Sequence, residues 1–113
     1  MSASPSRRER RALQRRADRL LARLSGVPLG CPEARPTSHI VLAGEHTPPL
    51  LVARASITPA LHAAGLHALG LEEALAEIAD ADDGKRYPVL VLIDGWLQCA
   101  WVALHPLTRG GDA

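Results

Sequence analysis

The chain has 113 residues, of which 47% are hydrophobic, and a formal net charge of +1. This length fits one domain with a single core, and two cysteines are too few for a disulfide framework. The sequence contains neither a run long and apolar enough to span a membrane nor a secretory signal, so we expect a cytoplasmic protein with no membrane association.

The small net charge conceals a strongly basic first segment. Residues 1–24 carry eight arginines against two acids, a net charge of +6, whereas the rest of the chain carries five bases against ten acids. Charge asymmetry of this kind is typical of an interaction arm. The chain also has twelve arginines and only one lysine, a bias that indicates a gene of a GC-rich bacterium or phage.

The basic segment itself predicts a helix over residues 7–24. Ser6 and Glu9 have the spacing of a capping box, in which each side chain binds the backbone N–H of the other residue. The apolar residues recur at helical spacing and form one stripe: Leu13, Ala17, Leu20, Leu21 and Leu24. The first two turns have almost no apolar residue, so we expect them to project into solvent. We therefore assign residues 1–26 to a basic amphipathic arm.

The middle of the chain predicts a linker, a hairpin and two short helices. Residues 27–38 are rich in proline and form the linker; residues 39–43 and 50–56 are strand candidates joined by a six-residue loop. Thr58 and Pro59 suit a helix start, followed by helical patterns over 59–69 and 71–81 with a break near Gly70. One kinked helix is the alternative.

The most distinctive segment, residues 87–104, predicts a β-hairpin. Asp94 and Gly95 suit a type I′ turn, which places Ile93 opposite Trp96. Gln98 is the only polar side chain between the turn and residue 104, so both faces of the hairpin should be covered. Either helices lie on both faces of the sheet, or one face is a subunit interface.

The order of these elements predicts an α+β fold. We expect an N-terminal basic helix and an antiparallel sheet of about four strands in two hairpins, with one or two short helices between the hairpins. Residues 39–106 would form the compact domain and residues 107–113 a flexible tail.

The basic helix is the first candidate binding surface. Arginine forks suit phosphates and carboxylates, so the helix could bind DNA or RNA, dock on an acidic protein, or be only a solvated face. Its candidate residues are Arg7, Arg8, Arg10, Arg11, Arg15, Arg16, Arg19 and Arg23.

An acidic segment is the second candidate. It could bind a basic partner or imitate a nucleic-acid backbone, or it could be the exposed side of an amphipathic helix. Its residues are Glu72, Glu73, Glu77, Asp80, Asp82 and Asp83.

The sequence predicts neither catalysis nor a cofactor nor a metal site. It lacks a nucleophile elbow, a phosphate-binding glycine loop and a pair of histidines at metal-ligand spacing. We therefore expect a small non-catalytic interaction or regulatory protein that binds a larger protein through charged surfaces. As an adaptor or inhibitor, it would use the acidic helix or the exposed edge of the hairpin to occlude a basic partner. A nucleic-acid accessory protein that uses the basic helix is the alternative, and self-association as a homodimer is expected in either case.

Overall fold

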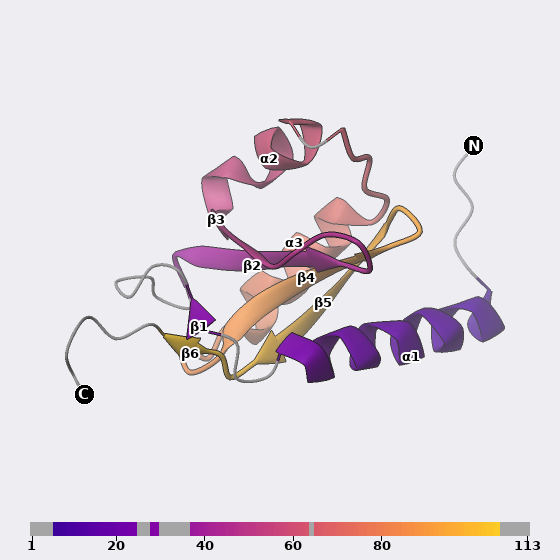
Figure 1. Ribbon diagram of the computed structural model, residues 1–113, viewed down its shortest axis with the longest axis horizontal. Coiled ribbons are helices and arrows are strands. Elements are labelled where there is room, and N and C mark those ends of the chain that lie inside the picture. Colours follow the sequence, from indigo (N-terminus) through magenta and orange to yellow (C-terminus); the bar gives the residue numbers. More distant parts are fainter. Residues whose placement is uncertain (1–5, 25–27, 30–36, 64, 107–113) are drawn as a thin grey trace.

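The computed structural model describes residues 6–24, 28–29, 37–63 and 65–106. The chain forms α1 (Arg7–Leu24), β1 (Pro28–Leu29), β2 (His39–Gly44), β3 (Leu50–Ala53), the 3₁₀ turn η1 (Arg54–Ser56), α2 (Ile57–Ala63), α3 (Leu71–Ala81), β4 (Tyr87–Ile93), β5 (Trp96–Val102) and β6 (His105–Pro106) (Figure 1). The predicted α+β class is confirmed. The predicted tail at 107–113 and most of the predicted linker lie outside the described residues.

Four strands form the main sheet in the order β3-β2-β4-β5. The two predicted hairpins are present, with β2 antiparallel to β3 and β4 antiparallel to β5. The pairing between the hairpins is parallel, because β2 and β4 run in the same direction, so the sheet is mixed and mostly antiparallel. The two most deeply buried strands thereby occupy the centre, since β2 and β4 are almost completely covered. A separate two-residue parallel pair joins β1 to β6.

The β4–β5 hairpin has the predicted turn and the predicted register. Ile93 pairs with Trp96, and both turn residues have positive φ, 53° at Asp94 and 77° at Gly95. Positive φ at both central residues defines a type I′ turn, whose twist matches that of the flanking strands.

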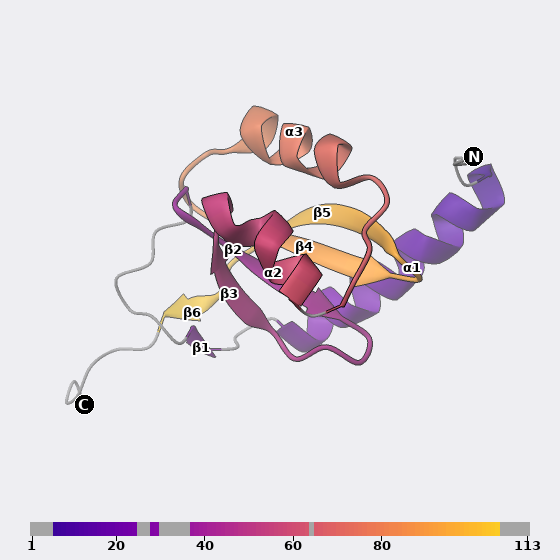
Figure 2. The same cartoon turned by 90° about the horizontal axis from the view of Figure 1, so that it is seen from above.

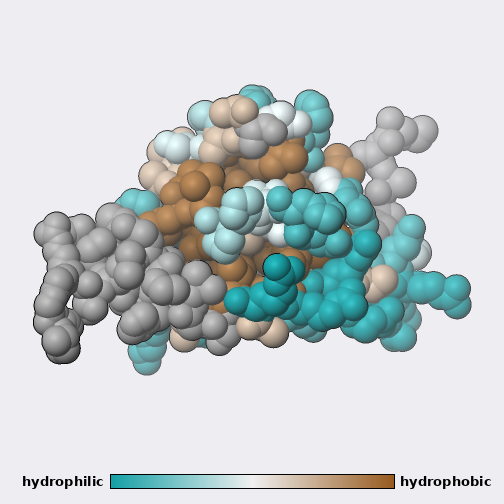
Figure 3. Space-filling view, viewed as in Figure 1, coloured by the Kyte–Doolittle hydropathy of each residue, from teal (hydrophilic) through white to brown (hydrophobic). Residues whose placement is uncertain are grey.

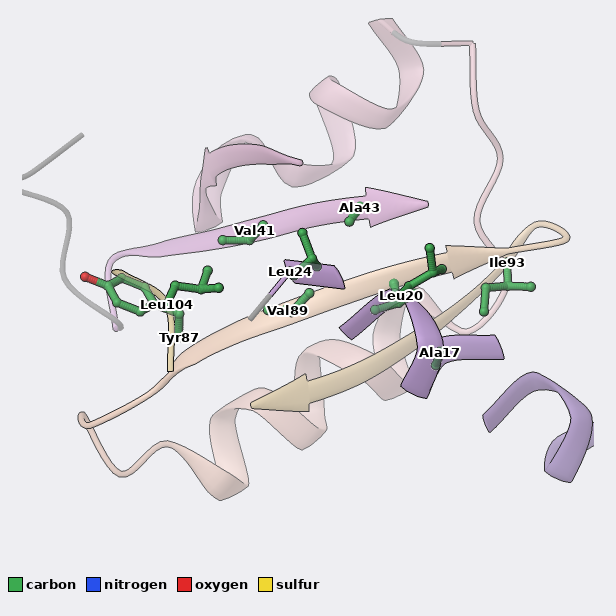
Figure 4. Packing of buried hydrophobic residues seen from close by; sticks show 10 residues of the cluster. Ala17, Leu20, Leu24, Val41, Ala43, Tyr87, Val89, Ile93 and Leu104 are labelled. Atoms are coloured by element: carbon green, nitrogen blue, oxygen red, sulfur yellow. The ribbon is translucent and has the colours of Figure 1, made fainter. Parts of the chain in front are cut away.

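Helices cover both faces of the sheet, which was the first of the two arrangements predicted from the apolar hairpin; the other was a subunit interface on one face. The helix α1 lies on one face, and α2 and α3 lie on the other (Figures 1 and 2). The apolar stripe of α1 is therefore buried within its own chain: Ala17, Leu20 and Leu24 pack against strand residues such as Val41 and Val89 (Figure 4).

The helix α1 begins and ends where the sequence indicated. The backbone N–H of Ser6 donates to Glu9 Oε1 (2.7 Å) and that of Glu9 donates to Ser6 Oγ (3.2 Å), so the capping box is present. These bonds lower the pKa of Glu9, chiefly through the Ser6 backbone N–H. Glu9 therefore stabilises the start of the helix at neutral pH, and this contribution disappears as the pH falls through the lowered pKa.

The helix α2 differs from the prediction at both ends. It begins at Ile57, two residues before Pro59, because the first helical N–H groups need no intrahelical acceptor and a proline is tolerated there. It ends by residue 63 instead of continuing to 69. The N–H of Gly65 donates to the carbonyl of His62 (2.9 Å) and that of Leu66 to the carbonyl of Leu61 (2.8 Å), the two bonds of a Schellman motif.

Candidate interaction surfaces

Four arginines form an exposed row along the outer side of α1. Arg8, Arg11, Arg15 and Arg19 are separated by three, four and four residues, so they lie on one side of the helix, opposite the buried stripe. At 1.5 Å per residue the row is about 16 Å long. Figure 3 shows the hydrophilic cover of α1 beside the hydrophobic surface over the sheet. We call these four residues the arginine row.

The other four predicted arginines have different positions. Arg7 and Arg23 are exposed near the two ends of α1. Arg10 lies on the flank that faces β5 and α3. Arg16 has its Nε 3.4 Å from Glu45 Oε2, and its Nη1 also bonds to Asp94 Oδ2.

Arg16 therefore has an intramolecular role. Glu45 follows β2 and Asp94 lies in the β4–β5 turn, so one guanidinium ties α1 to two loops at the same end of the sheet. The intramolecular role of Arg16 cannot be recognised from the sequence, because its two partners lie 29 and 78 residues away along the chain.

We expect Arg16→Ala to lower the free energy of unfolding by about 0.5–1 kcal/mol, since partly exposed ion pairs contribute modestly. Urea unfolding followed by tryptophan fluorescence would measure the change. Arg15→Ala is the matched control, because Arg15 is exposed and has no ion pair among the described residues, and it should have almost no effect. Equal losses for the two variants, or a loss that persists in 1 M salt, would contradict the ion-pair role.

The acidic residues divide into two groups. Glu72, Glu73, Glu77 and Asp80 are exposed on α3, on the opposite side of the sheet from α1. We call these four residues the acidic face.

Asp82 and Asp83 instead build the turn after α3. Their carboxylates accept hydrogen bonds from the N–H groups of Gly84 (3.0 Å) and Lys85 (2.9 Å). Asp83 also pairs with Arg86 at 3.2 Å, and its pKa is lowered, first by the Lys85 N–H. Asp82 and Asp83 therefore stabilise this turn, in addition to their predicted role in an acidic binding surface.

The basic and acidic surfaces do not neutralise each other. Within the described part of the chain, no ion pair joins α1 to α3, and the sheet lies between the two helices. As far as the described residues show, the arginine row and the acidic face are both exposed.

A groove runs beside β5, between the first half of α1 and the helix α3. It has a volume of about 380 Å³. One wall carries Arg10, Leu13 and Gln14 of α1, and the other carries Glu73 and Glu77 of α3. Its floor comprises Trp96, Leu97, Gln98 and Cys99 of β5. A second hollow lies between the end of α1 and the β2–β3 loop and is lined by residues such as Leu24, His46 and Pro49.

Two polar groups on the α2–α3 side were not identified as important from the sequence. Arg54 approaches Asp82 (Nη2 to Oδ2, 3.6 Å), yet its Nε and Nη2 are buried without a hydrogen bond among the described residues. Its only sequence signal is a lone charge after the apolar strand β3. Cys99 is half-buried, and burial, followed by the negative charge of Glu77, raises the pKa of its thiol to about 11. A thiol with such a pKa is a poor nucleophile at neutral pH.

Within the described residues, no group of three or more His, Cys, Asp or Glu side chains is arranged to hold a metal ion. The helices of this part of the chain are also too short or too polar to cross a membrane. Comparison of the chain with protein-family models, with curated proteins and with solved structures finds no match.

Proposed function

We propose that this protein is a non-catalytic adaptor or inhibitor that acts in the cytoplasm and docks on an acidic surface of a larger protein through the arginine row. One observation supports this proposal most directly. The apolar stripe of α1 is buried on the sheet, whereas the four arginines of the row are exposed and have no ion pair within the described residues. The sheet also gives the second half of α1, which carries Arg15 and Arg19, a rigid backing that lowers the entropic cost of docking.

A protein partner fits the charge distribution better than a nucleic acid does. The chain as a whole has a net charge of only +1, whereas nucleic-acid-binding domains are usually strongly basic. The helix α1 contains no aromatic residue that could stack on a base. The acidic face would in addition repel a polyanion that extended around the molecule.

The test compares the full chain with a variant in which the arginine row is replaced by glutamine: Arg8→Gln, Arg11→Gln, Arg15→Gln and Arg19→Gln. Each protein is used to recover stoichiometric partners from a lysate of the source cells, and the affinity for the purified partner is then measured. We expect the variant to bind about 100-fold more weakly, because each arginine would contribute roughly 0.7 kcal/mol.

The matched control neutralises two acids of α3 that do not line the groove beside β5, Glu72→Gln and Asp80→Asn. It removes exposed charges without changing the arginine row and should retain the partner. Unchanged affinity of the arginine-row variant for the partner would disprove the proposal.

Binding of a nucleic acid is the second candidate, because an exposed row of arginines is also what phosphate contacts require. Labelled single- and double-stranded DNA and RNA, titrated at several salt concentrations, would detect it. If all four arginines contact duplex phosphates, the logarithm of the affinity should fall with the logarithm of salt with a slope of about −3 to −4. Absence of binding at low salt would exclude this alternative.

A further inference from the structure

Within the described part of the chain, the outer edge of β5 pairs with only one residue, Leu69, whereas its inner edge pairs with β4. Residues 96–99 of β5 line the groove. The N–H of Leu97 points outward, because it donates to the carbonyl of Leu69 (2.9 Å). Outward and inward backbone groups alternate along an antiparallel strand, so Cys99 and Trp101 also present their N–H and C=O groups outward. These groups have no hydrogen-bond partner among the described residues.

This edge lacks the features that normally protect a strand from pairing. The seven residues of β5 include no charged residue and no proline. The opposite edge of the sheet, β3, is protected in two ways: it has only four residues, and it follows Pro48 and Pro49. The β5 edge is therefore better suited than the β3 edge to pair with a further strand.

The chain itself shows how a strand can be added there. Leu69 forms a one-residue parallel bridge with Trp96, in which its N–H donates to the carbonyl of Gly95 (2.6 Å) and its carbonyl accepts from Leu97. The chain then turns away into α3 at Gly70. An extended segment that continued the line of Leu69 would reach the unpaired groups of Cys99 and Trp101.

The walls of the groove specify the side chains of such a segment. Successive residues of a strand point to opposite faces of its sheet. One set would point towards Arg10 on α1, and the other towards Glu73 and Glu77 on α3. Acidic side chains are therefore favoured on the first set and basic side chains on the second.

We propose that the groove beside β5 binds an extended segment of a partner protein, which adds to the sheet as a fifth strand and carries acidic residues on its α1 side and basic residues on its α3 side. The backbone groups of Cys99 and Trp101 supply the hydrogen bonds, and the two charged walls select the sequence. This is strand addition with side-chain selection, a recurrent mode of peptide recognition.

A second copy of this chain fits the groove less well. Two β5 edges paired antiparallel about a two-fold axis would keep equivalent faces of the two sheets on the same side. Arg10 would then approach the Arg10 wall of the other copy, and Glu73 and Glu77 would approach their own counterparts. Like charges placed opposite each other across a sheet are destabilising.

The test uses two synthetic peptides of identical composition. The first repeats Glu-Lys-Val-Val, which places acids on one face of a strand and bases on the other. The second repeats Glu-Glu-Val-Val-Lys-Lys-Val-Val, which mixes both charges on each face. Binding to the full chain can be followed by the fluorescence of Trp96 and Trp101 and confirmed by calorimetry. We expect the first peptide to bind at least about tenfold more tightly than the second, a difference of 1.4 kcal/mol.

Two sets of variants locate the binding site. Cys99→Pro removes the outward N–H without removing a bond to β4, and it should weaken binding of the first peptide at least about tenfold, whereas Cys99→Ala should not. Should Cys99→Pro fail to fold, the double variant Glu73→Lys and Glu77→Lys changes only exposed side chains and should cause a similar loss. The arginine-row variant should bind the peptide normally, so failure of the proposed function and failure of this proposal are distinguishable.

Several results would overturn the proposal. They are equal affinities for the two peptides, no binding of either peptide up to about 1 mM, and an unchanged affinity in the Glu73→Lys and Glu77→Lys variant. A dimer of the full chain in sedimentation that Cys99→Pro converts to monomer would show that a second copy occupies the groove instead.

Discussion

Replacing Leu90 by alanine should lower the free energy of unfolding by about 3–4 kcal/mol, since a buried leucine-to-alanine change loses both its transfer free energy and the packing around the new cavity. Leu90 lies in the central strand β4 and has no exposed surface, beneath α2 and α3. A domain of this size has a total stability of roughly 5–15 kcal/mol, so the variant should retain only part of its stability. Urea unfolding followed by tryptophan fluorescence measures the change.

The matched control is Leu50→Ala, the same substitution in the edge strand β3. Leu50 is 51% exposed, so its replacement should change the free energy of unfolding by no more than about 0.5 kcal/mol. Similar losses at the two positions would show that β4 is not at the centre of the sheet. A small loss at both would indicate a core that rearranges to fill the cavity.

The elements that the sequence predicted best are specified by neighbouring residues. The ends of α1 follow from Ser6 and Glu9 at its start and from the apolar stripe that ends at Leu24. The register of the β4–β5 hairpin follows from the two residues of its turn, Asp94 and Gly95, since a two-residue loop leaves one way of pairing the strands. Information of this kind lies within about four residues of the structure that it determines.

The features that the sequence did not predict depend on contacts between distant residues. The parallel pairing of β2 and β4 requires the chain to cross the sheet through α2 and α3 and to return beside β2, and no local signal distinguishes this path from a return beside β3. The start of α2 at Ile57 has a similar origin. This side chain is only 3% exposed in the core, and its burial outweighs the local preference for a start at Pro59.

The same distinction applies to the candidate surfaces. The excess of arginine in α1 is plain in the sequence, but the separation of an exposed row from Arg16 and Arg10 becomes visible only in the folded chain. Arg16 forms ion pairs with Glu45 and Asp94 within the chain. Arg10 lines the groove beside β5 together with Glu73 and Glu77. A sequence therefore indicates that charged surfaces exist, whereas the fold decides which charges are available to a partner.

The alkylation of Cys99 provides the second large effect. Burial and Glu77 raise the pKa of this thiol to about 11, so its thiolate fraction at pH 8 should be about 100-fold lower than that of an ordinary cysteine, whose pKa is 9.0. We expect iodoacetamide to modify Cys99 about 100-fold more slowly in the folded protein than in urea. The measurement requires a Cys31→Ser background, so that one thiol is observed.

The pH dependence and a charge variant separate the two causes of this pKa. The raised pKa means that folding favours the neutral thiol, so this contribution to stability is present below pH 9 and is lost as the pH rises through about 11. Glu77→Gln should accelerate alkylation only in part, because burial is the larger cause. Alkylation at the same rate in the folded protein and in urea would show that Cys99 is exposed. The half-buried position of Cys99 in the floor of the groove beside β5 would then be wrong. If the proposed peptide covers that floor, its binding should slow alkylation further, which links the chemistry of one thiol to the occupancy of the β5 edge.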